Sequence, residues 1–223
     1  SLSIASGETV AIVGANGSGK TTLSKLLCGL YTPDEGSITI GGADSSCTSP
    51  EKLYAKTSAV FQDYMRYGGL TLRENVEISD ILHKKDAGTF MKQTGCSESL
   101  LESDKMDSLM GREFDGLELS GGQWQRIAMA RGLYRDSNFI LLDEPTSAID
   151  PLEESRIYKM FASVAKDKTC VLVTHRLGSA RIADRIIVMD AGHIVETGTH
   201  EELLQKKGLY HEMWTSAAEQ YVC

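Results

Sequence analysis

A glycine-rich stretch near the start of the chain has the residues needed to bind phosphate groups. It reads Gly14-Ala15-Asn16-Gly17-Ser18-Gly19-Lys20-Thr21, which fits the pattern GxxxxGK[ST]. Glycines let backbone N–H groups reach phosphate oxygens without obstruction by Cβ atoms, and Lys20 adds a positive charge for the β- and γ-phosphates. The pattern predicts a nucleoside triphosphate site formed by Gly14, Asn16, Gly17, Ser18, Gly19, Lys20, Thr21 and Thr22.

Two adjacent carboxylates follow an apolar run further along the chain. Asp143 and Glu144 come after Phe139–Leu142 and before Pro145. Ligands of parallel sheets gather at the carboxyl ends of the strands, so Asp143 is placed to hold Mg²⁺ through water, together with the Thr21 hydroxyl. The alternative is a pair of acids that only caps the strand, which the four preceding apolar residues and the following proline disfavour.

The pentapeptide Leu119-Ser120-Gly121-Gly122-Gln123 lies between these two motifs. It precedes a predicted helix over Gln123–Leu133, so the amides of Ser120, Gly121 and Gly122 would form a second anion-binding helix N-terminus. The alternative is an ordinary N-cap, because Ser120 would cap the helix in either case.

Strands and helices alternate along much of the chain. Strands are predicted over Glu8–Val13, Ser37–Ile40, Ala59–Phe61, Phe139–Asp143, Cys170–Thr174 and Arg185–Asp190, with a hairpin through Gly192 into His193–Thr197. Apolar residues at helical spacing predict helices over Thr21–Leu30 and Leu152–Lys166. This alternation predicts an α/β fold with a mostly parallel sheet covered on both faces.

Strand signals disappear between Tyr64 and Ser137, where helix-compatible segments such as Leu72–Ile78 and Ala87–Gln93 take their place. We therefore predict a single domain over residues 1–223. Its nucleotide-binding core would comprise 1–63 and 138–223, and an inserted helical subdomain over 64–137 would carry the LSGGQ sequence.

Composition narrows the class of protein. A formal net charge of -8 argues against a nucleic-acid binder that depends on bulk positive charge. No apolar run approaches the roughly 20 residues that a membrane-spanning helix needs, and Ser1–Ser6 has no features of a signal peptide. The scattered cysteines, with no CxxC pair, indicate free thiols in a reducing compartment: Cys28, Cys47, Cys96, Cys170 and Cys223. We expect a cytoplasmic domain.

With LSGGQ between the phosphate loop and the acidic pair, the chain resembles the ATPase domain of ABC transporters over nearly its whole length. The resemblance implies a P-loop NTPase core with an inserted helical subdomain, and ATP and Mg²⁺ as ligands. It also implies a head-to-tail dimer, in which Ser120, Gly121, Gly122 and Gln123 of one domain face the γ-phosphate held by a second ABC ATPase domain.

The resemblance also assigns roles to single residues. Glu144 would polarise the attacking water, and His175 would contact the γ-phosphate. Gln62 matches the glutamine that reaches Mg²⁺ or the water and senses the transport domain. Asp150, in Ser147–Asp150, belongs to a loop that carries signals between the two sites, with Ile149 in place of the more usual leucine. The other histidines are interpreted as surface residues: His83, His193, His200 and His211.

The C-terminal part resembles that of exporters in this family, in Thr174–Leu177, Ala183–Met189 and Ile194–Leu203. This implies a transmembrane domain on the same full-length polypeptide and a location at the cytoplasmic face of the cell membrane. The second ATPase domain could be identical or different. Gln62 and Tyr64–Tyr67 are the candidate docking surface for the membrane domain, the alternative being a solvated loop. Gly111–Glu118 is placed like a short exporter motif but differs from it in sequence.

Members of this family usually have an aromatic residue well before the phosphate loop, which stacks on adenine. Thirteen residues precede Gly14 and none is aromatic. We expect the sequence to be part of a longer one, and to bind nucleotide more weakly than a chain extended upstream.

The sequence disfavours three other functions. A separately encoded importer ATPase subunit is disfavoured by the C-terminal part. A soluble ABC ATPase acting on nucleic acid or ribosomes would carry a second cassette or a long coiled coil, and neither is present. A non-catalytic regulatory domain is disfavoured by the intact Lys20, Asp143, Glu144 and His175. The transported substrate, whether peptide, lipid or drug, would be selected by a membrane domain.

Overall fold

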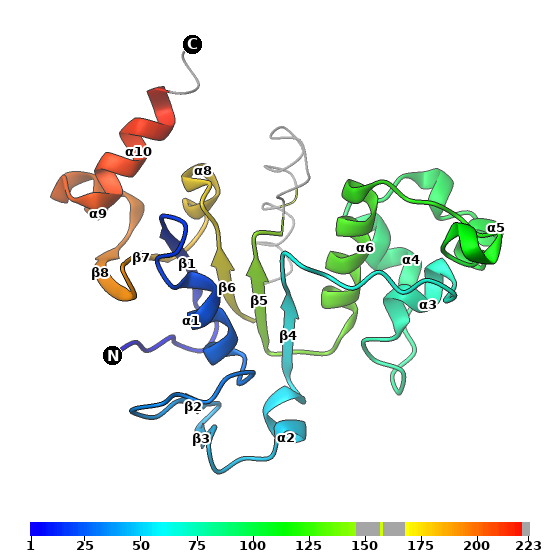
Figure 1. Ribbon diagram of the computed structural model, residues 1–223, viewed down its shortest axis with the longest axis horizontal. Helices are drawn as coiled ribbons and strands as arrows, with labels where there is room; N and C mark the ends of the chain where they lie inside the picture. The colour runs from blue at the N-terminus through cyan, green and yellow to red at the C-terminus, as the bar shows by residue number, and fades with distance from the viewer. Residues whose placement is uncertain (146–156, 158–167, 220–223) are drawn as a thin grey trace. The chain divides into compact units, whose positions relative to one another are not determined.

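The computed structural model describes residues 1–145, 157 and 168–219. The chain divides into two compact units (Figure 1). The first comprises Ser1–Ala59, Ser137–Glu144 and Ala162–Cys223, and the second comprises Val60–Asp136 and Pro145–Phe161. The predicted helix over Leu152–Lys166 lies outside the described residues, except for Ile157, which is helical and buried.

A six-stranded sheet with the order β4-β5-β6-β1-β7-β8 organises the first unit. The neighbours β5, β6, β1 and β7 pair in parallel, and β8 runs antiparallel to β7. The prediction of a mostly parallel α/β fold is therefore confirmed. The strands are β1 (Thr9–Gly14), β4 (Thr57–Val60), β5 (Phe139–Asp143), β6 (Thr169–Val173), β7 (Arg185–Asp190) and β8 (His193–Gly198), with a separate antiparallel pair of β2 (Thr39–Ile40) and β3 (Ala43–Asp44).

The prediction of a strand over Ala59–Phe61 was wrong in its bounds, because β4 ends at Val60. Phe61 and Gln62 follow it outside any strand, so the glutamine is carried by a loop.

The central strand β1 is buried along Val10–Val13, as expected for a parallel strand covered on both faces. Ala11 and Val13 share a core cluster with residues of β7 and of three helices at the end of the chain. These helices are α8 (Leu177–Ala180), α9 (His200–Lys206) and α10 (Leu209–Glu219). The helix α1 (Lys20–Leu27) contacts β1, β5 and β6, and the short α2 (Pro50–Tyr54) precedes β4.

A tight turn joins β7 to β8. Its two central residues, Ala191 and Gly192, both have positive φ angles, of 45° and 82°. Positive φ at both positions is typical of a type I′ turn, whose twist matches that of the flanking antiparallel strands. The amide of Gly192 donates a 3.1 Å hydrogen bond to the carbonyl of Ser18, so this hairpin supports the glycine-rich loop.

The second unit is helical and is built around α6 (Gly121–Tyr134). Buried residues of α6, including Trp124, Ile127 and Tyr134, share a core cluster with Leu72 and Met91 of two other helices. The remaining elements are α3 (Leu72–Glu77), α4 (Ala87–Gln93), α5 (Ser103–Met106) and the 3-10 turns at Glu98–Leu100 and Arg112–Phe114.

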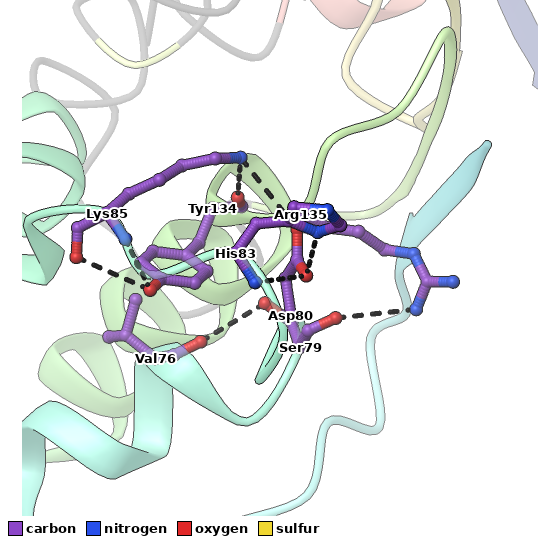
Figure 2. Close-up of polar contacts among 7 residues, drawn as sticks. All are labelled: Val76, Ser79, Asp80, His83, Lys85, Tyr134 and Arg135. Carbon is purple, nitrogen blue, oxygen red and sulfur yellow. Dashed lines mark hydrogen bonds and ion pairs between the residues drawn. The ribbon is translucent and has the colours of Figure 1, made fainter. Parts of the chain in front are cut away.

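The segment between α3 and α4 is hydrogen-bonded to the C-terminal end of α6 (Figure 2). Lys85 donates from its backbone amide to Tyr134 Oη at 2.9 Å and from Nζ to the Tyr134 carbonyl at 2.6 Å. A cation at this end of a helix is favourable because the last carbonyl groups carry partial negative charge. His83 lies beside Asp80, with 2.9 Å between Nδ1 and Oδ1, and both belong to the same segment.

The interpretation of His211 as a surface residue was wrong, because it is half-buried, and the same holds for His200. Its Nδ1 lies 2.8 Å from Tyr210 Oη, and its ring packs edge-on to Trp214 with 4.6 Å between centroids. The cause is tertiary: α10 places its aromatic residues against the first turn of α9. Within the described ranges, every helix is too short or too polar to cross a bilayer.

Candidate functional site

The glycine-rich loop connects the end of β1 to the start of α1. Gly17 and Gly19 have φ angles of 79° and 96°, which glycine adopts without the strain that a side chain would add. A Cβ at Gly14 would collide with the carbonyl oxygen of Met189. The loop therefore lies directly against β7, and glycine is required at the point of closest approach.

Lys20 begins α1 and is buried. Its Nζ donates to the carbonyl oxygens of Gly14 and Ala15, at 2.9 and 2.8 Å. Burial lowers the pKa of Lys20, while the charges of Glu144 and Asp143 raise it. The ammonium group is thus held at the centre of the loop, with the two carboxylates close enough to influence it.

Ser18 carries a polar atom that lacks a partner. The residue is only 3% exposed, and Oγ has no hydrogen-bond partner within the described part of the chain. A buried hydroxyl of this kind costs free energy unless something bonds to it. The N-terminus of α1 also has no side-chain cap. Free amides and an unpartnered hydroxyl at one loop fit the oxygens of a phosphate group.

Asp143 ends β5 and is buried. Burial, followed by the neighbouring charge of Glu144, raises its pKa to about 6, while Lys20, Lys25 and a hydrogen bond with Thr21 act in the opposite direction. A carboxylate and a hydroxyl side by side are oxygen ligands of the kind Mg²⁺ accepts. Across the described residues, no three His, Cys, Asp or Glu side chains gather as a metal cluster. These two residues fit a magnesium ion whose other ligands are phosphate and water.

Glu144 and His175 meet beyond the ends of two neighbouring strands. Glu144 has a φ angle of 49°, uncommon for a residue with a side chain, and its amide donates to the Val173 carbonyl at 2.9 Å. Its Oε1 lies 2.9 Å from His175 Nδ1. Such a backbone conformation persists where the surrounding structure imposes it, and it is often found at functional sites.

The first unit therefore contains the glycine-rich loop with Thr21 and Thr22, and also Asp143, Glu144 and His175. Gln62 and the LSGGQ residues belong to the second unit, and Gln62 is exposed there. Asp150, with the rest of Ser147–Asp150, lies outside the described residues.

Ser120 and Gln123 form a reciprocal capping box at the start of α6. Ser120 Oγ accepts from the Gln123 amide at 3.3 Å, and Gln123 Oε1 accepts from the Ser120 amide at 2.8 Å. Ser120 therefore caps the helix, as expected under both interpretations, and Gly121 at the helix N-terminus is exposed. Ser and Gln three residues apart are the sequence signal for this box.

The sequence placed Tyr64 in the candidate docking surface but gave no sign that its hydroxyl donates to the Gly121 carbonyl, at 2.9 Å. It also gave no sign of the support that Gly192 gives to Ser18. No local pattern could have revealed the Tyr64 contact, because 57 positions separate the two residues. The Ala191-Gly192 turn was visible in the sequence, but its position beneath the loop was not.

Comparison with known proteins gives a consistent result. The family model described as ABC transporter matches residues 1–147. The subtilin transport ATP-binding protein SpaT of Bacillus subtilis is 44% identical, over 95% of this chain and 35% of its own length. The nisin transport ATP-binding protein NisT of Lactococcus lactis is 38% identical, over 99% of this chain and 37% of its own length.

A solved structure of a bacterial Atm1-family ABC exporter with ATP bound superimposes with a TM-score of 0.87 and 34% identity, over 96% of this chain and 37% of that one. The chain thus spans little more than a third of the length of these relatives. Because the family model covers more than half of the chain, and LSGGQ stands between the phosphate loop and the acidic pair, this chain belongs to the ABC transporter family.

Proposed function

We propose that this chain is the ATP-hydrolysing domain of an ABC exporter. The observation that carries the proposal is the Glu144–His175 pair, 2.9 Å apart, in the same unit as the glycine-rich loop. A carboxylate held by a histidine beside a phosphate-binding loop is suited to directing water onto a phosphoryl group.

The residues of the loop would bind the triphosphate. Lys20 would exchange its bonds to the Gly14 and Ala15 carbonyls for bonds to phosphate oxygens, and Ser18 Oγ would gain its missing partner. Thr21 and Asp143 would hold Mg²⁺, which neutralises charge on the phosphates.

In the reaction we propose, water attacks the γ-phosphorus in line with the leaving oxygen. Glu144 would orient the water and accept its proton, while His175 holds the carboxylate and donates toward the γ-phosphate. Lys20 would stabilise the charge that develops on the phosphoryl oxygens. Ser120 and Gly122 of a second copy, or of a related domain, would add donors from the opposite side in a head-to-tail dimer with two ATP molecules. Such a closed two-fold arrangement is common among oligomers.

The exporter assignment rests on the relatives. SpaT and NisT are described as transport ATP-binding proteins, and the structural neighbour as an ABC exporter. By this proposal the chain works at the cytoplasmic face of a membrane, with a transmembrane domain on the same polypeptide that docks near Gln62 and Tyr64–Tyr67. Met65, in that segment, is 63% exposed.

Phosphate release from ATP and Mg²⁺ tests the enzymatic proposal. Glu144→Gln should lower kcat by about 100-fold or more while ATP binding persists. Glu51→Gln, at an exposed residue of α2, is the matched control. Turnover of Glu144→Gln at the wild-type rate would refute the assigned role.

The size of the native polypeptide tests the exporter proposal. An antibody to this domain should detect, in membranes of the source cells, a chain about three times as long, since the domain covers 35% of SpaT. A product of about 24.3 kDa would instead indicate a separate ATPase subunit.

A further inference from the structure

Tyr64 connects the segment after Gln62 to the first residue of α6. Its hydroxyl donates a 2.9 Å hydrogen bond to the carbonyl of Gly121, within the second unit. Its ring packs against the core cluster of that unit, and the Arg66 guanidinium lies 5.7 Å from the ring centroid. The hydroxyl is therefore held in place by contacts of the ring.

This hydrogen bond acts on the amide that follows. The peptide group that contains the Gly121 carbonyl also contains the Gly122 N–H, and a peptide group is planar. Fixing the direction of the carbonyl therefore fixes the direction of the N–H. Gly122 lies in the first turn of α6, where amides have no partner inside the helix and can bind an anion.

Glycine makes this position sensitive. Gly121 and Gly122 have no side chains, so side-chain packing adds no restraint to the peptide group between them. A Cβ at Gly121 would meet nothing within 4 Å, so no neighbouring atom blocks a change at that residue. As in any α-helix, the Gly121 carbonyl also accepts from the amide four residues further on, and the Tyr64 hydroxyl adds a second donor from outside the helix.

The same segment is attached to α6 at a second place. Arg131 donates from Nη1 to the Met65 carbonyl at 3.0 Å, and its guanidinium lies 4.7 Å from the centroid of the Tyr67 ring. Arg131 is ten residues after Gly121, or about 15 Å along a helix. Two attachments so far apart set the orientation of the segment along α6.

We propose that Tyr64 is a positioning residue for ATP hydrolysis: through the Gly121 carbonyl, it aims the Gly122 N–H at the γ-phosphate bound by the opposite domain. The proposal rests on the dimer described under Proposed function. It adds a residue from outside the LSGGQ sequence to the anion-binding helix N-terminus that this sequence forms.

Dimerisation in the Glu144→Gln background tests the proposal on the 223-residue chain. Tyr64→Phe removes only the hydroxyl, and we expect ATP-dependent dimerisation, measured by analytical ultracentrifugation, to weaken by about tenfold. ATP binding to the monomer and its melting temperature should stay at the values of the parent. Tyr54→Phe is the matched control, because Tyr54 also donates to a glycine carbonyl, that of Gly29 at 3.1 Å, but in the first unit.

A second measurement detects the Gly122 amide directly. In the ¹⁵N-glycine spectrum of the free chain, Tyr64→Phe should move the resonance of Gly122 and leave that of Gly132, further along α6, in place. A merely structural role would instead lower the melting temperature and shift both resonances.

The outcomes separate the two proposals. Equal dimerisation with and without the Tyr64 hydroxyl would overturn the positioning role and leave the dimer standing. If Glu144→Gln does not dimerise with ATP at all, the dimer itself is refuted, and the role of Tyr64 in it is refuted too.

Discussion

His175 Nδ1 lies 2.9 Å from Glu144 Oε1, although 31 positions separate the two residues in the chain. The register of the sheet explains the contact. Asp143 of β5 pairs with Val173 of β6, so the residues just beyond the two strands become neighbours. Side-chain exposures of 16% for Glu144 and 49% for His175 place the carboxylate on the inner side of the pair and the imidazole nearer the solvent.

The first prediction concerns the coupling of this pair. If His175 acts by orienting Glu144, then His175→Ala should lower kcat by about 100-fold, and the double variant with Glu144→Gln should be no slower than Glu144→Gln alone. Initial rates of phosphate release at saturating ATP measure this cycle. His193→Ala, at an exposed histidine, should turn over like the wild type. Full additivity of the two effects would show that the residues act independently.

Ser18 gives a prediction in which stability and binding change in opposite directions. Because its buried Oγ lacks a partner in the described part of the free chain, Ser18→Ala should leave the free energy of unfolding unchanged or raise it by about 1 kcal/mol. The affinity for ATP should fall by about three- to tenfold, since a phosphate oxygen loses a donor. Urea unfolding and calorimetric titration measure the two quantities.

Ser24→Ala is the matched control for this prediction. Ser24 is also buried in α1, but its Oγ donates to the Lys20 carbonyl at 2.9 Å. Its loss should lower stability by about 1 kcal/mol, with little direct effect on ATP binding. Equal stability losses in both variants would mean that Ser18 Oγ is already bonded in the free chain.

Lys20 should be required for nucleotide binding. Lys20→Ala removes the charge at the centre of the loop, and the dissociation constant for ATP should rise by at least about tenfold. Lys52→Ala removes an exposed charge from α2 in the same unit and should bind like the wild type. Fluorescence titration with a labelled ATP analogue measures the affinity of each variant. A comparable loss of affinity in both variants would show that the change in net charge is the cause.

The pairing of Glu8 with Arg185 predicts a dependence of stability on pH. The hydrogen bond from Arg185 lowers the pKa of Glu8, and the shortest of its contacts is 2.6 Å. A depressed pKa in the folded state means that this contribution is present above the unfolded value, about 4.3, and is lost as the pH falls through the folded value.

Glu8→Gln should accordingly cost about 1 kcal/mol at pH 7, and the difference from the wild type should shrink below about pH 4. Urea unfolding of both proteins at pH 7 and below about pH 4 measures whether this stability difference shrinks. A difference that stays constant with pH would assign the effect to packing and not to the ionised carboxylate.

Much of the fold was predictable because it rests on local patterns. The buried run in β1 and the alternation of strands with helices predicted a mostly parallel sheet, and the sheet is observed. The bounds of β5, β7 and α4 match the predicted ranges, since apolar spacing and turn residues mark their ends. The assigned role of each site residue stays a prediction, because it depends on ligands and on a second domain.

By itself, the sequence determined the family, the residue types of the phosphate loop and the acidic pair, and the direction of most strands. Only the tertiary structure decided which of these groups meet. It placed His175 against Glu144, left Ser18 Oγ without a partner among the described residues, and joined Tyr64 to Gly121. The physical reason is that a local pattern reports how the backbone will run, whereas these contacts depend on the register between strands and on packing between segments far apart in the chain.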